Sequence, residues 1–178
     1  MSRTVFNTLM LTAMGALLGG CGLTQSISEG SASTARAIFY KQVNTVRLDF
    51  SVRQAINTHS LNMSGLAAPT LVRVYQLRSA KALELASYDN LLAEGASVLE
   101  EDLLDERAVV VKPGEGAQVS VPMDQRAQAV AVVALFREPD TRLNTWRIVL
   151  TRDDLDPDRA RVLELADNHL ALRPLGKE

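Results

Sequence analysis

The chain has 178 residues, 22% of them charged, and a net charge of −2, so it lacks the basic excess that nucleic-acid-binding domains usually carry. A single cysteine excludes an internal disulfide, and with only two histidines beside it a structural zinc site is not expected. We therefore expect no metal and no cofactor, and a fold that is stabilised by packing alone.

The amino terminus has the layout of a bacterial secretory signal peptide. Arg3 precedes an apolar run over residues 9–18, and small residues follow it. The run is about ten residues long, whereas a helix that crosses a bilayer needs roughly twenty. We expect residues 1–20 to be a signal peptide that is removed, not a membrane-spanning anchor.

The sequence Leu18-Gly19-Gly20-Cys21 resembles the lipobox of bacterial lipoproteins, in which the cysteine is acylated and becomes the first residue of the mature protein. The alternative is a free cysteine buried in a core helix. Residues 21–44 then comprise the lipidated cysteine and a tether rich in serine and glycine. No aspartate follows Cys21 to retain the protein in the inner membrane, so the resemblance implies lipid anchoring in the outer membrane, at its periplasmic face.

Residues 45–178 are predicted to form one domain of short strands. Residues 46–53 alternate strictly between apolar and polar side chains, which is typical of a strand with one buried face. The continuously apolar run 129–136 indicates a strand that is covered on both faces. Six further strands are predicted at residues 70–77, 107–111, 118–121, 145–150, 162–165 and 169–172.

Between the strands predicted at residues 70–77 and 107–111 the pattern changes from strand to helix. Residues 81–86 and 88–94 are predicted to be short helical turns, the second ending at Gly95, and residues 96–104 fit either a helix or a strand. About eight short strands separated by turn signals favour an all-β fold, an antiparallel β-sandwich with a small helical insertion.

The connection between the first two strands, residues 57–68, is about twice as long as an ordinary hairpin loop. It contains Leu61, Met63 and Leu66, three apolar residues that a purely solvated loop does not need. They either pack back onto the core of the domain or contact a partner. The length and composition make this segment a candidate functional loop.

No group of residues has the arrangement of an active site. Neither His59 nor His169 has an acid and a nucleophile near it in the sequence, and Trp146 is expected to fill the core. The acidic clusters 100–102 and 153–156 are interpreted as solvated turns, with a calcium site as the alternative, because neither has the glycine-punctuated loop of an EF-hand. The sequence predicts a protein that is not an enzyme.

Several short motifs together resemble the TssJ family (also called VasD or SciN), the outer-membrane lipoproteins of the bacterial type VI secretion system. The motifs occur in the same order as in that family, at residues 69–78, 86–92, 102–104, 113–114, 134–137 and 146–147. The resemblance implies a transthyretin-like β-sandwich with a helical insertion. It also implies a role in anchoring the trans-envelope membrane complex to the outer membrane.

In that family the partner is the periplasmic C-terminal domain of TssM, a large inner-membrane protein, and the loop between the first two strands makes the contact. The resemblance therefore implies that this loop is the partner-binding site. Its candidate residues are Asn57, Thr58, His59, Ser60, Leu61, Asn62, Met63, Ser64, Gly65 and Leu66. The location of the site is carried over, and not the role of any one side chain, because the loop varies within the family.

Two other function classes remain as alternatives. A periplasmic binding module for a small ligand or glycan needs a deep pocket or clustered aromatic residues, and only 4% of the residues are aromatic. A lipid-anchored hydrolase needs a nucleophile and a base in contact. No small-molecule substrate is expected.

Overall fold

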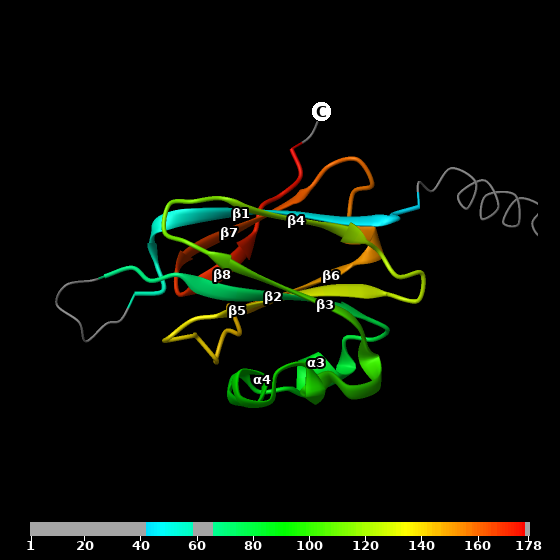
Figure 1. The fold of residues 1–178 in the computed structure, drawn as a ribbon, viewed down its shortest axis with the longest axis horizontal. Coiled ribbons are helices and arrows are strands. Elements are labelled where there is room, and N and C mark those ends of the chain that lie inside the picture. Colours follow the sequence, from blue (N-terminus) through cyan, green and yellow to red (C-terminus); the bar gives the residue numbers. More distant parts are fainter. Residues whose placement is uncertain (1–41, 59–65, 177–178) are drawn as a thin grey trace, which may run out of the picture. The chain divides into compact units, whose positions relative to one another are not determined.

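β1 (Thr45–Ile56) runs along the sandwich from one end to the other (Figure 1). The structure is a computed structural model in which residues 42–58 and 66–176 are described. Buried and half-buried side chains alternate along β1 from Thr45 to Phe50, because successive residues of a strand point to opposite faces. This confirms the strand predicted at residues 46–53.

The eight strands form two four-stranded sheets. The first has the order β4-β1-β7-β8, in which β4 is Ala117–Pro122, β7 is Arg161–Asp167 and β8 is His169–Leu172. The second has the order β3-β2-β5-β6, with β3 at Leu103–Val111, β2 at Thr70–Leu77, β5 at Ala129–Leu135 and β6 at Arg147–Thr151. The β-sandwich is thereby confirmed.

The pairing is antiparallel throughout except between β1 and β7, which run parallel. The sequence did not predict this pair, because the two strands are separated by most of the domain. The ambiguous segment 96–104 divides into a 3-10 helix, η1 (Gly95–Asp102), and the start of β3. That strand is thus longer than the predicted 107–111.

The space between the sheets is filled by side chains from both of them. Leu48 and Phe50 of β1, Val72 of β2, Val132 of β5 and Leu163 of β7 are at most 2% exposed. Gln76 also lies in the core, where its amide nitrogen donates to Pro122 O and its amide oxygen accepts from Asp124 N. A buried polar side chain that uses both its donor and its acceptor in this way links the sheets without an unpaired group.

The other face of the second sheet is covered by the helical insertion, α3 (Lys81–Leu85), α4 (Tyr88–Glu94) and η1 (Figure 1). Six of the seven residues of β5 are buried, which agrees with the coverage on both faces that the apolar run predicts. Tyr88 of α4 packs edge-to-face on Trp146 with ring centroids 5.2 Å apart. Trp146 is 1% exposed and belongs to the core, as predicted.

Two arginines of the sheet hold the insertion in place. In the strand register Arg73 of β2 and Arg147 of β6 both lie opposite Val133 of β5, so the three residues form one row across the sheet. Arg73 donates to the carbonyl of Leu91, and Arg147 donates to the carbonyls of Leu83 and Ala86. These carbonyls lie in α4 and at the end of α3, and those of Leu91 and Leu83 also accept from the backbone N–H groups of Gly95 and Ala86.

Candidate functional site

The loop between β1 and β2 is described at its two ends only. Asn57 and Thr58 leave β1, and residues 66–69 lead into β2. Leu66 is 69% exposed, so this apolar side chain does not pack onto the core. The other candidate residues lie outside the described residues, namely His59, Ser60, Leu61, Asn62, Met63, Ser64 and Gly65.

The base of the loop is organised around Asn57, which is 4% exposed. Its amide nitrogen donates to Pro69 O at 3.1 Å, and its amide oxygen accepts from Arg137 N at 2.7 Å. Its backbone N–H donates to Asp167 O. One residue therefore connects the end of β1 with the start of β2, with the connection that follows β5 and with the end of β7.

Two further hydrogen bonds close the same base. The amide of Asn168 donates to Thr58 O at 3.0 Å, and the backbone N–H of Ala68 donates to Ile56 O at 3.2 Å. Asn57 itself has φ = 51°, in the left-handed region that asparagine tolerates better than most residues. Sequence reasoning identified the loop but missed this network; the signal that was present is an asparagine directly after a strand.

The opposite end of the sandwich receives the chain at residues 42–44. Arg152 lies there, and its guanidinium donates to the carbonyls of Ala127 (2.7 Å), Asp124 (2.8 Å) and Val43 (3.2 Å). Arg161 of β7, 7% exposed, donates to Asp154 O at 2.6 Å. β1 connects the two ends with 12 residues, which at about 3.3 Å each span at most roughly 40 Å.

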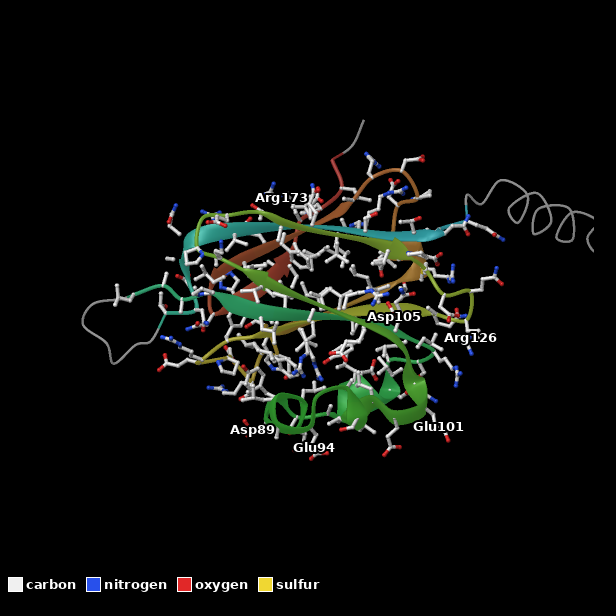
Figure 2. All side chains as sticks on the ribbon, in the orientation of Figure 1. Asp89, Glu94, Glu101, Asp105, Arg126 and Arg173 are labelled. Carbon is white, nitrogen blue, oxygen red and sulfur yellow. The ribbon has the colours of Figure 1, made fainter. Side chains whose placement is uncertain are left out.

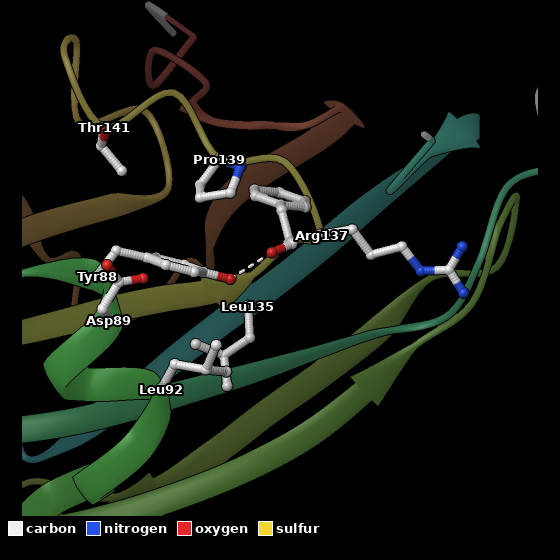
Figure 3. A pocket seen from close by; sticks show the side chains of 8 residues that line it. Tyr88, Asp89, Leu92, Leu135, Arg137, Pro139 and Thr141 are labelled. Carbon is white, nitrogen blue, oxygen red and sulfur yellow. Dashed lines mark hydrogen bonds between the residues drawn. The ribbon is translucent and has the colours of Figure 1, made fainter. Parts of the chain in front are cut away.

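An open hollow lies beside the loop end, between α4 and the connection that follows β5 (Figure 3). Tyr88 donates its phenolic O–H to Phe136 O across the hollow, and burial raises the pKa of this tyrosine to about 12. Leu92, Leu135 and Pro139 supply the apolar part of its lining. No histidine, cysteine or serine is among the described residues that line the hollow, whose polar side chains are Tyr88, Asp89, Arg137 and Thr141.

Charged side chains elsewhere lie mostly on the surface, and three of them, Asp89, Glu94 and Glu101, are on the outside of the helical insertion (Figure 2). Asp154 accepts hydrogen bonds from the hydroxyl and the backbone N–H of Thr151, which lower the pKa of its carboxyl. Across residues 42–58 and 66–176, no three acidic, histidine or cysteine side chains form a group that could hold a metal ion. His169 is exposed on β8, and His59 lies outside the described part of the chain.

None of the helices in the described ranges is both long and apolar enough to cross a bilayer. Cys21, for which lipidation is predicted, lies outside those ranges.

Comparison with known proteins gives a consistent result. A family model described as "Type VI secretion lipoprotein, VasD, EvfM, TssJ" matches residues 44–172. None of the curated proteins compared with the chain matches it.

Several solved structures resemble three quarters of the chain. A chain of a structure described as "Type VI membrane complex" is 38% identical with a TM-score of 0.70, and the match covers 75% of this chain and 100% of that one. A chain of a structure described as "T6SS protein TssM C-terminal domain (869-1107) from EAEC" is 36% identical with a TM-score of 0.67 and the same coverage. The T6SS lipoprotein TssJ1 from Pseudomonas aeruginosa is 26% identical, with a TM-score of 0.59 and coverage of 75% and 98%.

Proposed function

This chain belongs to the type VI secretion lipoprotein family, and from that premise we propose that it anchors the type VI membrane complex to the outer membrane. We propose that it does so by binding the periplasmic C-terminal domain of a TssM-like inner-membrane protein through the loop at residues 57–66, in which Asn57 forms the buried base and the contacts come from the residues after it. In this proposal the protein is a scaffold component and catalyses no reaction.

The partner is supported by the solved structures. One structure is described as the TssM C-terminal domain. In it, the full length of the matched chain corresponds to 75% of this chain. It is therefore much shorter than the range 869–1107 in that description. We infer that the matched chain is a second component of that structure, which favours TssM as the partner of this protein too.

The membrane attachment rests on the amino terminus. We propose that residues 1–20 are removed, that Cys21 carries the lipid, and that residues 21–44 form the tether to the domain at 45–178. In agreement with this division, the compact unit that contains the sandwich begins at Gln42. The lipid would attach the sandwich to the membrane by the end at which β1 starts.

The observation that carries the proposal is the position of the loop. The described chain enters the sandwich just before β1, and the loop leaves it at the other end of the same strand, at most roughly 40 Å away. A lipoprotein held at one end in this way presents the loop to the periplasm, where a partner from the inner membrane can reach it. The exposed side chain of Leu66 is available for such a contact.

The test is a binding measurement with the full chain, purified in detergent, against the periplasmic domain of a TssM-like protein from the same genome. Replacing residues 59–66 with a Gly/Ser segment of equal length should abolish binding. Leu66→Ser alone should weaken it, and Leu85→Ser is the matched control, because Leu85 is an equally apolar, 88% exposed side chain on the helical insertion. Absence of binding by the folded wild-type protein contradicts the proposal and favours the small-ligand module instead.

Cys21→Ser tests the anchor separately. The variant should fold and bind the partner domain, but should no longer sediment with outer membranes in cell fractionation. If the variant still sediments with the outer membrane, the proposed lipid anchor is wrong.

A further inference from the structure

We propose that Asn57 is a positioning residue for partner binding: it holds the base of the β1–β2 loop in one geometry and does not itself touch the partner. This inference rests on the proposed function of the loop. It concerns a role distinct from that of the contact residues, and its evidence lies in the two described ends of the loop.

The first observation is that both the oxygen and the nitrogen of the Asn57 carboxamide already form hydrogen bonds within the domain. Its amide oxygen accepts from Arg137 N, its amide nitrogen donates to Pro69 O, and its side chain is buried. A partner that used this carboxamide would have to break hydrogen bonds inside the domain, which leaves buried groups without partners. Asn57 is therefore poorly placed as a contact residue.

The second observation is what the carboxamide joins. Asn57 and Pro69 are the two ends of the loop, so the bond between them sets the distance across which the loop is closed. The bond from Arg137 fixes the same residue to the connection after β5, and the backbone bond to Asp167 fixes it to the first sheet. The loop thus leaves the domain from a base that is tied to both sheets.

The third observation is that this position suits asparagine better than any other residue. The backbone conformation has φ = 51°, which asparagine, aspartate and glycine tolerate. Of these, only asparagine combines a donor and an acceptor on one short side chain. Aspartate would place an oxygen against Pro69 O, and glycine would remove both hydrogen bonds.

A loop that is held in its bound conformation before the partner arrives binds more tightly, because less conformational freedom is lost on association. Release of the base would allow other conformations and reduce the fraction of molecules that can bind at once. We expect the effect of losing Asn57 to appear as weaker and slower association, without loss of any side chain that contacts the partner.

The experiment uses the full chain in detergent and the periplasmic domain of a TssM-like protein from the same genome. Asn57→Gly keeps the left-handed backbone free of strain and deletes the carboxamide. The matched control is Asn144→Gly, because exposed Asn144 has φ = 53° and lies in the connection between β5 and β6, so it experiences the same backbone change. We expect Asn57→Gly to weaken binding at least tenfold and Asn144→Gly to change it less than twofold.

Hydrogen exchange of the unbound protein separates this role from general destabilisation. In Asn57→Gly the amides of Arg137 and Ala68 should exchange at least tenfold faster, while the amides of β5 keep their protection. Asn57→Asp, which retains the acceptor for Arg137 N, should protect the Arg137 amide but still lose affinity. This variant also serves if Asn57→Gly does not fold.

The outcomes distinguish the two proposals. Wild-type binding together with unchanged affinity of a folded Asn57→Gly protein overturns the positioning role and leaves the proposed function intact. Failure of the wild-type protein to bind overturns the proposed function, and with it the role assigned to Asn57. Loss of affinity with faster exchange confined to the loop base supports the inference.

Discussion

The two ends of this sandwich are closed by different chemistry. Where the chain enters, arginine side chains donate to backbone carbonyls: Arg152 to Val43, Asp124 and Ala127, and Arg161 to Asp154. At the loop end, the neutral carboxamides of Asn57 and Asn168 serve the same purpose. Hydrogen bonds from a charged donor are stronger than those between neutral groups.

The difference suggests a division of tasks between the ends. The end at which the described chain begins is closed by strong, always-charged donors, so its residues should affect stability. The loop end is closed by weaker bonds at the base of the proposed binding segment, so its residues should affect binding more than stability.

The largest effect on stability is expected at Arg152. Arg152→Ala removes hydrogen bonds from a guanidinium to three carbonyls in two segments, the residues before β1 and the β4–β5 connection, and should lower the free energy of unfolding by about 2–3 kcal/mol. Urea unfolding followed by circular dichroism measures this, and partner affinity should not change. Arg152→Lys should recover only part of the loss, because a single ammonium group cannot reach the same carbonyls.

The control for that substitution is Arg126→Ala, which removes an arginine from the neighbouring connection between β4 and β5. Arg126 pairs with the carboxylate of Asp124 on the surface, and such pairs contribute little to stability. If Arg126→Ala destabilises the protein as much as Arg152→Ala does, the hydrogen bonds from Arg152 to backbone carbonyls are not what stabilises this end.

The second prediction concerns the loop. Replacing Leu61 and Met63 with serine should weaken binding of the TssM-like domain by on the order of 2 kcal/mol, about 30-fold, if one of them is an anchor of the interface. The melting temperature should stay nearly unchanged. A large fall in melting temperature would instead assign these side chains to the core of the domain and remove them from the proposed interface.

Much of this architecture was predictable, because it depends on local pattern. The alternation over residues 46–53 predicts both the strand and its buried face, and the valine-rich run 129–136 predicts a strand without a solvent-exposed side. The helical insertion follows from the change of period after residue 77 and from Gly95, whose φ of 64° ends α4. In each case neighbouring residues determine the outcome.

The rest depends on contacts between residues far apart in the chain. The parallel pairing of β1 with β7, and the bonds from Asn57 to Arg137 and Asp167, join segments that local patterns cannot associate. The network at the loop base was therefore missed although the loop was identified. The partner-binding role of residues 57–66 and the lipidation of Cys21 stay predictions.

The third prediction tests whether the helical insertion supports the loop end. Tyr88 donates to Phe136 O, next to the residue whose backbone N–H is held by Asn57, so Tyr88→Phe should lower the free energy of unfolding by about 1 kcal/mol. Partner affinity should change little, because the loop base keeps its own bonds. If Tyr88→Phe lowers the binding free energy by as much as it lowers the free energy of unfolding, the insertion and the loop base form one unit.

The pH dependence of the same substitution is informative. Burial, and then the charge of Asp89, raises the pKa of Tyr88 from 10.0 to about 12, so the phenol donates its hydrogen bond throughout the neutral range. Its contribution should be complete below pH 10 and be lost as the pH rises toward 12. Wild-type stability should therefore fall more steeply than that of Tyr88→Phe in this interval.

The smallest effect is expected from the charges on the outer face of the first sheet. Arg53, and next Arg173, donate to the carboxylate of Glu164 and lower its pKa. A carboxyl whose pKa is lowered by folding stabilises the protein at pH values above its ordinary pKa of 4.5, and the contribution is lost as the pH falls below that value.

At neutral pH Glu164→Gln should destabilise the protein less than Tyr88→Phe does, since Arg53 is 67% exposed and solvent screens the pair. Urea unfolding below pH 4.5 should show a steeper loss for the wild type than for the variant, with Glu115→Gln as a control on an exposed pair. A Glu164→Gln effect as large as that of Arg152→Ala would mean that surface ion pairs stabilise this sandwich as much as the hydrogen bonds from Arg152 to backbone carbonyls do.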